Sequence, residues 1–217
     1  SKWMKKVFCR DLNLNISKNN FKVIPNPVDN SYFRKFNRSK KIRNNILIIK
    51  NFGSYKYAGD ITIDYLIKFS KMKLFNNFKF TLIGKGPILE KSKQFIKRLN
   101  NVKIIDNYIS NEKLHRYHKE NSIFIYLTRM DSQSVTLSEA LSSGLVSISS
   151  NNTAIPEFIN NNHNGFLIND FEDFINCIKL LNKNTKLLKK ISNNSIKKSK
   201  FLQPESIYNE ERKFLKL

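Results

Sequence analysis

Ile123-Phe124-Ile125-Tyr126-Leu127 is an unbroken apolar run of strand length, and Ile46-Leu47-Ile48-Ile49 is a second one. Strands with apolar residues on both faces are typical of a parallel sheet that helices cover on both sides. Further runs of strand length lie before, between and after these two, at Phe21–Ile24, Phe78–Ile83, Val102–Ile105, Val146–Ser149 and Phe166–Ile168.

Segments of helix length separate the predicted strands. In the first of them, Ile61, Tyr65 and Phe69 recur at helical spacing, with Lys68 on the other side. The predicted helices are 60–72, 88–99, 110–120, 134–143, 154–160 and 171–182. Repeated strand–helix–strand units predict an α/β fold with a doubly wound, Rossmann-like parallel sheet. Such a sheet binds its ligand beyond the carboxyl ends of the strands, near a topological switch point.

The two ends of the chain differ from its middle. Residues 1–14 have the pattern of one helix, and Ile24-Pro25-Asn26-Pro27-Val28-Asp29 is a rigid turn signal. Residues 34–45 are polar and basic, which predicts an exposed loop. Lys183 to Lys200 is rich in Lys and Asn with spaced Leu and Ile. We interpret it as a solvated helix face, the alternative being a basic amphipathic helix on a membrane surface.

Length and composition exclude several classes of protein. The chain has 217 residues, of which 40% are hydrophobic and 12% aromatic, enough for a sizeable core. No apolar stretch approaches the length of about 18 residues that a membrane span needs, and Ser1-Lys2-Trp3-Met4-Lys5-Lys6 is not a signal peptide. Cys9 and Cys177 lie far apart and suggest a reducing cytosol.

The formal net charge of +22 raises the question of a nucleic-acid partner. Lys is spread along the whole chain, and Lys, Asn and Ile together reflect AT-rich codons. The sequence has neither a zinc finger nor an RNA-binding signature with interleaved aromatic residues. We therefore expect no nucleic-acid partner. Anionic substrates or an anionic membrane surface fit the charge equally well.

Two loops carry glycine and lysine directly after predicted strands. Lys50, Gly53, Lys56 and Gly59 lie in the loop after the strand 46–49, where backbone N–H groups and a helix end can hold a phosphate. The loop lacks the order of a Walker motif, and an ordinary strand–helix loop is the alternative. Gly84-Lys85-Gly86-Pro87 resembles half a dinucleotide fingerprint, but a tight turn with positive φ is the favoured interpretation.

The most specific pattern spans residues 131–144. Asp131 follows a predicted strand, and Glu139 lies about one turn into the next helix. The N–H groups at the start of that helix, near Ser134, Val135 and Thr136, face the gap between the two acids. Amides and the helix dipole suit a pyrophosphate, and each carboxylate suits sugar hydroxyls. The alternatives are a glycosidase pair of carboxylates, or Asp131 as a helix cap with Glu139 as a surface charge.

His115 and His118 are three residues apart on a predicted helix and raise the question of a metal pair. No third ligand is nearby, and Arg116 and Lys119 surround them. We interpret both as solvated histidines and expect no metal site.

Five segments follow the order and spacing of a known family: Val23–Phe33, Ile46–Lys56, Phe80–Pro87, Asp131–Gly144 and Ile155–Leu167. On these segments the chain resembles the C-terminal, nucleotide-sugar-binding half of a GT-B glycosyltransferase of family 4. This is the retaining group related to bacterial capsule and O-antigen enzymes.

The resemblance implies a role for each matching residue. Lys56 would bind the donor diphosphate, and Asp131 stands where the family has the first Glu of an E-x7-E motif. It would contact the donor sugar, one methylene shorter than usual. Lys56 and Asp131 are thus the predicted catalytic pair. The helix start, at Ser134, Val135 and Thr136, would contact the phosphates, and Glu139 would hold the ribose.

Other donor contacts are implied with less direct matches. The family usually has an Arg just past the first strand, where this chain has Asn51 preceded by Lys50, and we expect Lys50 to be the substitute cation. Gly53 and Gly84 lie in the two matching glycine loops. Tyr108 and Ile109 fall where the base commonly packs. Enzymes of this kind stabilise the leaving diphosphate with Lys and amides, so we expect neither a metal nor another cofactor.

The resemblance also implies an organisation and a function. Residues 1–20 would be a junction helix from a preceding acceptor-binding domain, 21–200 the donor-binding domain, and 201–217 a crossover helix. The expected activity is retaining transfer of a hexosyl group from an NDP-sugar to a polysaccharide or lipid-linked acceptor. It would serve bacterial capsule or lipopolysaccharide synthesis in the cytoplasm or at the inner face of an anionic membrane. A GT-B sugar-nucleotide epimerase and a basic nucleic-acid-binding α/β domain are the alternatives.

Overall fold

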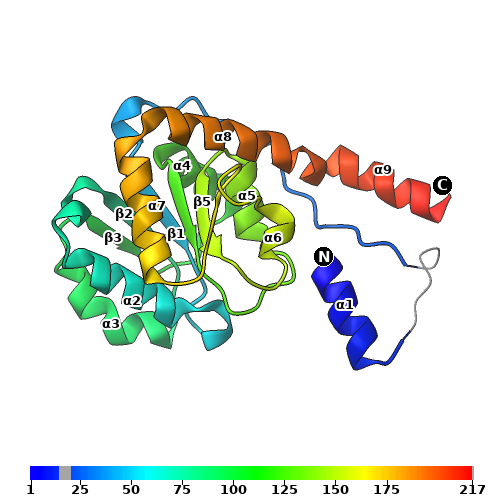
Figure 1. Ribbon diagram of the computed structural model, residues 1–217, viewed down its shortest axis with the longest axis horizontal. Coiled ribbons are helices and arrows are strands. Elements are labelled where there is room, and N and C mark those ends of the chain that lie inside the picture. The colour runs from blue at the N-terminus through cyan, green and yellow to red at the C-terminus, as the bar shows by residue number, and fades with distance from the viewer. Residues whose placement is uncertain (15–20, 217) are drawn as a thin grey trace.

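A six-stranded parallel sheet forms the centre of the molecule (Figure 1). The computed structural model describes residues 1–14 and 21–216. The strand order is β3-β2-β1-β4-β5-β6, and every pair of neighbours is parallel. The strands are β1 (Asn45–Ile49), β2 (Lys79–Ile83), β3 (Val102–Ile105), β4 (Ile123–Tyr126), β5 (Val146–Ser150) and β6 (Phe166–Ile168). The predicted α/β class with a doubly wound, Rossmann-like sheet is confirmed.

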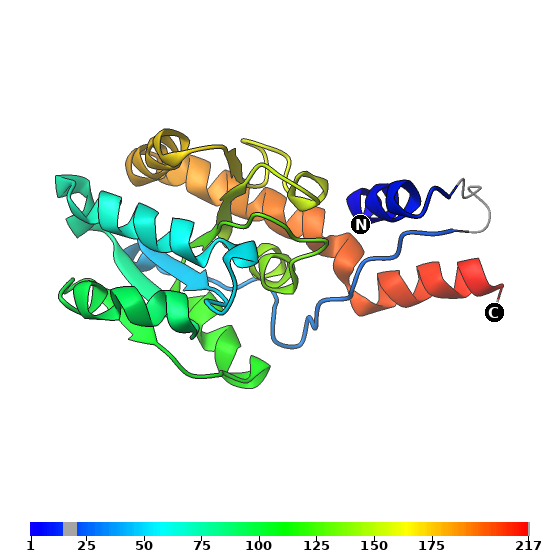
Figure 2. The same cartoon turned by 90° about the horizontal axis from the view of Figure 1, so that it is seen from below.

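Helices cover the two faces of the sheet (Figures 1 and 2). Side chains of α2, α3 and α7 pack on one face, and those of α4, α5 and α6 pack on the other. The α-helices are α1 (Lys2–Asp11), α2 (Gly59–Ser70), α3 (Pro87–Lys97), α4 (Asn111–Glu120), α5 (Val135–Ser142), α6 (Ile155–Phe158), α7 (Phe171–Lys183), α8 (Thr185–Ser199) and α9 (Pro204–Leu215). Short 3-10 helices are η1 (Lys40–Ile42), η2 (Tyr55–Tyr57), η3 (Lys73–Asn77) and η4 (Lys200–Leu202).

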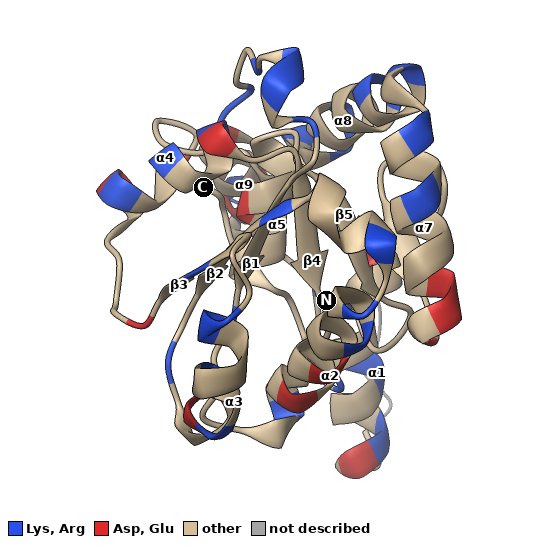
Figure 3. Ribbon diagram, turned by 90° about the vertical axis from the view of Figure 1, so that its left-hand side faces the viewer, with Lys and Arg blue, Asp and Glu red and all other residues tan. Residues whose placement is uncertain are grey.

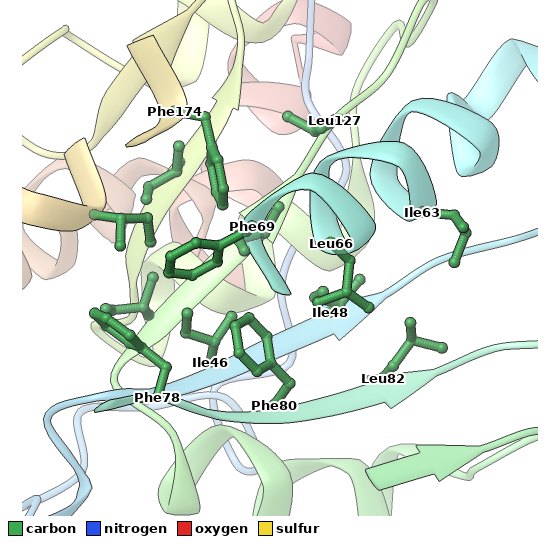
Figure 4. Packing of buried hydrophobic residues seen from close by; sticks show 14 of the residues in the cluster. Ile46, Ile48, Ile63, Leu66, Phe69, Phe78, Phe80, Leu82, Leu127 and Phe174 are labelled. Atoms are coloured by element: carbon green, nitrogen blue, oxygen red, sulfur yellow. The ribbon is translucent and has the colours of Figure 1, made fainter. Parts of the chain in front are cut away.

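The central strand β1 has apolar side chains on both faces of the sheet, so both faces must be covered. Ile46 and Ile48 belong to the core on one side of the sheet, and Leu47 belongs to the core on the other. On the first side, Phe69 of α2 is fully buried among aromatic rings (Figure 4). Its ring packs edge-on at 5.3 Å from Phe75 and at 5.9 Å from Phe174. This aromatic cluster joins α2, α7 and the sheet into one core.

Two glycines bring the loops after β1 and β2 into backbone contact. Gly84 and Gly86 have φ of +146° and +144°. A Cβ on Gly84 would lie 1.9 Å from the carbonyl oxygen of Lys50, and one on Gly86 would lie 2.3 Å from the carbonyl carbon of Phe52. The tight turn with positive φ is therefore confirmed, and close approach of the two backbones is a second reason for glycine.

The predicted strand Phe21–Ile24 is wrong, because this segment pairs with no strand. Two prolines follow directly, and the segment lies outside the sheet, where Phe21 packs on Phe8 of α1 and Val23 and Ile24 lie beside α9. The first helix ends at Asp11 rather than at residue 14, and α6 is shorter than the predicted helix 154–160. Residues 15–20 of the predicted junction helix lie outside the described residues.

The prediction of an exposed loop over residues 34–45 is also wrong in part. Arg38 is half-buried and donates hydrogen bonds to the carbonyl oxygens of Ser143 at 2.7 Å, His118 at 2.9 Å and Gly144 at 3.2 Å. This anchors the segment to the ends of α4 and α5.

His118 was expected in solvent, but it is completely buried against Phe33 and Phe124. Its Nδ1 lies 3.0 Å from the Ser143 hydroxyl, and burial lowers its pKa to about 3. The neutral imidazole packs among aromatic rings, with its Nε2 unpartnered among the described residues, so His118 is a structural residue of the core.

Replacing Phe69 by Ala should lower the free energy of unfolding by about 3–5 kcal/mol, since the cavity cannot be refilled by the rigid rings around it. Urea denaturation followed by circular dichroism measures this change. Phe95→Ala is the matched control, because that ring is 42% exposed, and it should cost less than about 1 kcal/mol. Equal losses in the two variants would contradict the packing described for Phe69.

Candidate functional site

The switch point of the sheet lies between β1 and β4. From β1 the chain continues outward to β2 and β3, and it then returns to the other side of β1 to form β4. Leu47 of β1 stands opposite Phe124 of β4 in a parallel register. The loops that leave the carboxyl ends of these two strands therefore diverge and leave a place for a ligand between them. Most of the predicted site residues lie on these two loops or directly after them.

Backbone hydrogen bonds tie the two loops together. The carbonyl oxygen of Lys56 accepts from the N–H groups of Arg129 at 3.1 Å and Met130 at 3.3 Å. The Arg129 guanidinium in turn donates to both carboxylate oxygens of Asp60, each at 2.7 Å, and to the Tyr55 carbonyl at 2.6 Å. The backbone of Lys56 is thus fixed from the β4 side, and its side chain is exposed.

The ion pair between Arg129 and Asp60 could not be predicted from the sequence. The two residues are far apart in the chain, and neither has a characteristic spacing to a motif. The only available signal was a cation just after a buried strand.

Lys50 is almost completely buried, at 4% exposure. Its Nζ donates to the carbonyl oxygen of Leu127 and lies 4.0 Å from the centre of the Tyr126 ring. Burial lowers the pKa of Lys50 to about 7, although the charge of Asp131 acts in the opposite direction. The side chain lies between β1 and β4, beneath the loops rather than on their surface.

Asp131 is held by its neighbours in one orientation. Its Oδ2 accepts from the Tyr126 hydroxyl at 2.5 Å, and its Oδ1 accepts from the Gln133 N–H at 3.0 Å. The Gln133 side chain also forms two hydrogen bonds with the backbone of Asn26. Its Oε1 accepts from the Asn26 N–H at 2.7 Å, and its Nε2 donates to the Asn26 carbonyl oxygen at 3.0 Å. Asp131 is half-buried, and the proline-rich turn 24–29 is docked beside it.

The start of α5 faces the same region. Ser134 is the N-cap, and its hydroxyl accepts from the Leu137 N–H at 3.1 Å. The interpretation of Asp131 as the cap is therefore wrong. The first N–H groups of a helix have no partner within the helix, and here they belong to Val135 and Thr136. These amides and the positive end of the dipole can bind an anion.

Glu139 lies one turn further along α5 and is only 5% exposed, so the interpretation as a surface charge is wrong. Among the described residues its Oε2 finds no hydrogen-bond partner. Burial raises its pKa to about 7. A buried carboxylate oxygen without a partner is costly to the fold, which suits a group that accepts hydrogen bonds from a ligand.

The remaining predicted residues surround this centre. The Asn51 side chain accepts from the Gly53 N–H at 2.7 Å and shapes the loop after β1, and Gly84 lies against that loop. Tyr108 is 87% exposed after β3, while Ile109 is half-buried against the core. The structure brings the loop, Asp131 and α5 together at one edge of the sheet, and donor contact by these residues stays a prediction.

A large groove of the described residues lies away from the predicted donor site. A groove of about 710 Å³ is formed by residues of α1, the segment 23–25, α6 and α9, and it contains none of the predicted donor-binding residues. Over residues 1–14 and 21–216, no group of three or more His, Cys, Asp and Glu side chains is placed to hold a metal ion. Within the same residues, no helix is long and apolar enough to cross a membrane.

Comparison with known proteins identifies the family. Residues 30–198 match the family described as Glycosyl transferases group 1. An uncharacterized 41.2 kDa protein in the cps region of Klebsiella pneumoniae is 28% identical over 180 residues, which cover 78% of this chain and 47% of that protein. The chain thus spans about half the length of this curated relative.

Solved glycosyltransferase structures have the same fold. A glycosyltransferase from Rickettsia africae superposes with a TM-score of 0.81 at 19% identity, covering 100% of this chain and 62% of that one. An Anabaena protein crystallised with UDP and glucose superposes with a TM-score of 0.73 at 17% identity, covering 90% of this chain and 56% of that one. At such identities the likeness shows the fold, which is GT-B-like. With more than half of its residues matching the family, the chain belongs to the group 1 glycosyltransferases.

Proposed function

We propose that this chain binds the nucleotide-sugar donor of a retaining glycosyltransferase of family 4, with the donor across the switch point between β1 and β4. The observation that carries the proposal is the start of α5 between two acids, Asp131 before it and the buried, unpartnered Glu139 within it. A nucleoside diphosphate sugar has an anionic centre with a hydroxylated ring on each side, which matches this order of groups.

Each group has a distinct part in the proposed reaction. The amides of Val135 and Thr136 and the ammonium of Lys56 stabilise the negative charge that grows on the diphosphate as the bond to the sugar breaks. Glu139 accepts hydrogen bonds from the ribose, and Asp131 accepts them from the transferred sugar. No metal or other cofactor enters this scheme. Lys50 lies below the loop surface, and the negative charge of the bound diphosphate would favour its protonated form there.

We further propose the wider setting that the family resemblance implies. The described region from residue 21 to 200 is the donor-binding domain, with α1 as the junction to an acceptor-binding domain and α9 as the crossover helix. The transferred group is a hexose, and the product is a bacterial surface glycan. A relative from a cps region supports the link to capsule synthesis.

The first test is ligand-observed NMR of the chain with UDP, GDP, ADP and CMP. We expect one nucleoside diphosphate to bind, and Lys56→Ala and Glu139→Ala should each weaken it about tenfold or more, since each removes a charged hydrogen-bonding group. Lys91→Ala and Glu112→Ala remove the same charges from exposed positions of α3 and α4 and should leave affinity unchanged. Binding that survives in both site variants would contradict the proposed donor site.

The raised pKa of Glu139 gives a pH dependence of stability. In the unfolded chain this carboxyl loses its proton near its ordinary pKa of 4.5, whereas in the folded chain it keeps the proton up to a pH of about 7. The folded state therefore binds more protons between these values, and its stability falls as pH rises through that window. Glu139→Gln removes this loss and should raise the free energy of unfolding at pH 8 by on the order of 1–3 kcal/mol.

Thermal denaturation at pH 5 and pH 8 measures this effect. The stabilisation by Glu139→Gln should be small at pH 5 and large at pH 8, and the variant should weaken nucleotide binding more at pH 8, where the folded carboxyl has lost its proton. Glu112→Gln, an exposed residue of α4, is the control and should change neither property. An equal effect of Glu139→Gln at the two pH values would show that the carboxyl is not desolvated.

A further inference from the structure

A basic groove lies on the outer side of α4, away from the carboxyl edge of the sheet. Residues 31–39 run beside this helix and enclose two cavities with it, of about 570 and 510 Å³. Both cavities are lined by Asn37, His115 and Lys119, so they adjoin, and together they are called the groove here. None of the residues proposed to bind the donor lines it.

Cations dominate the wall of this groove. Arg34 and Lys35 line it from the segment side, and Arg116 and Lys119 line it from α4, whose basic residues are visible in Figure 3. Among the described residues, none of these four side chains forms an ion pair with a carboxylate, although many other lysines and arginines of the chain do not either. The one acidic residue on the wall is Glu120.

The distinguishing feature is a fifth cation that the fold holds rigidly in the wall. Arg38 lines the groove with its guanidinium bonded to three backbone carbonyls, all of them uncharged. Burial lowers the pKa of Arg38 to about 10, and its buried Nε has no partner among the described residues. Its three carbonyl partners belong to the C-terminal ends of α4 and α5, whose dipoles hold the guanidinium in place, and no carboxylate pairs with it among the described residues.

A second buried polar atom points to the same conclusion. The Nδ1 of His115, a residue common to both cavities, is buried and also lacks a partner among the described residues. The Tyr32 ring lies 6.0 Å from the His115 ring, and Phe36 lines the same cavity. The groove therefore combines cations that pair with no carboxylate among the described residues and two aromatic side chains, above two buried nitrogen atoms without a partner.

We propose that this groove is a second anion site that binds a phosphate group. Guanidinium groups match the oxygen geometry of a phosphate, and lysine adds a mobile charge. The two aromatic side chains can pack against an organic group attached to the phosphate. That phosphate can belong to a free metabolite or to a lipid headgroup, which share this chemistry. The site is separate from the start of α5 and does not depend on the proposed function.

The histidine ring protons report on the groove in NMR spectra. The chain has three histidines, of which His115 lines the groove and His163 is exposed beyond the sheet edge near β6. Titration with inorganic phosphate should shift the His115 signals along a saturating curve and leave those of His163 nearly unchanged. Sodium chloride at equal ionic strength should not reproduce the shift. Parallel, unsaturated shifts of both histidines would overturn the proposal.

A charge-reversed pair of variants makes the test specific. Arg116→Glu with Lys119→Glu should weaken phosphate binding about tenfold or more. Lys97→Glu with Arg98→Glu changes the net charge by the same amount at the end of α3 and should retain binding. If phosphate binding weakened equally in both double variants, net charge alone would explain the loss, and the proposal would be overturned.

Sedimentation with vesicles then distinguishes the two sources of phosphate. If the ligand is a lipid headgroup, phosphatidylglycerol vesicles should bind the unmodified chain and the Lys97/Arg98 variant but not the Arg116/Lys119 variant, and phosphatidylcholine vesicles should bind none of them. If saturable phosphate binding occurs without vesicle binding, the proposed site takes a free phosphate ester. Vesicle binding that persists in the Arg116/Lys119 variant, together with a flat phosphate titration, would overturn the site.

Discussion

The pairing of β1 with β4 is the constraint on which the rest of the molecule depends. Both strands are apolar on both faces, so each must lie inside the sheet with helices above and below. The crossovers then place β2 and β3 on one side of this pair and β5 and β6 on the other. Two loops are thereby left to diverge at one edge, and the proposed donor site depends on that divergence.

The site at this edge is built from groups that are unfavourable in the isolated chain. Lys50 and Glu139 are both desolvated, and burial pushes the pKa of each toward its neutral form. Their opposite charges are separate, since Lys50 lies under Tyr126 and Glu139 lies in α5. Such groups lower stability, and their retention is understandable if a ligand supplies the missing partners. The surrounding hydrogen bonds of Asp131 and the Arg129–Asp60 pair hold the positions fixed before any ligand arrives.

Structural features that depend on residues close together in the chain could be predicted from the sequence. Six strands and most of the helices could be predicted because apolar runs and helical spacing are local, and the glycines of residues 84–86 could be assigned to a positive φ. The motif 131–144 placed Asp131, the N-terminus of α5 and Glu139 correctly along the chain. Phe21–Ile24 shows the limit of this reasoning, because its apolar residues pack on α1 and α9 rather than in a sheet.

What could not be predicted is the set of contacts between distant polar residues. Arg129–Asp60, Gln133–Asn26 and Arg38 with the ends of α4 and α5 each join segments with no shared periodicity.

The net charge follows from the sequence, whereas the placement of individual charges depends on the fold. Most of the +22 comes from lysines spread over the surface, whose charges solvent and salt screen and which are compatible with many partners. Arg38 differs because the fold half-buries it and fixes its guanidinium on backbone carbonyls at the ends of α4 and α5, in the wall of the groove. For a basic protein of this kind, the burial and fixed geometry of a few cations are more informative about anion binding than their total number.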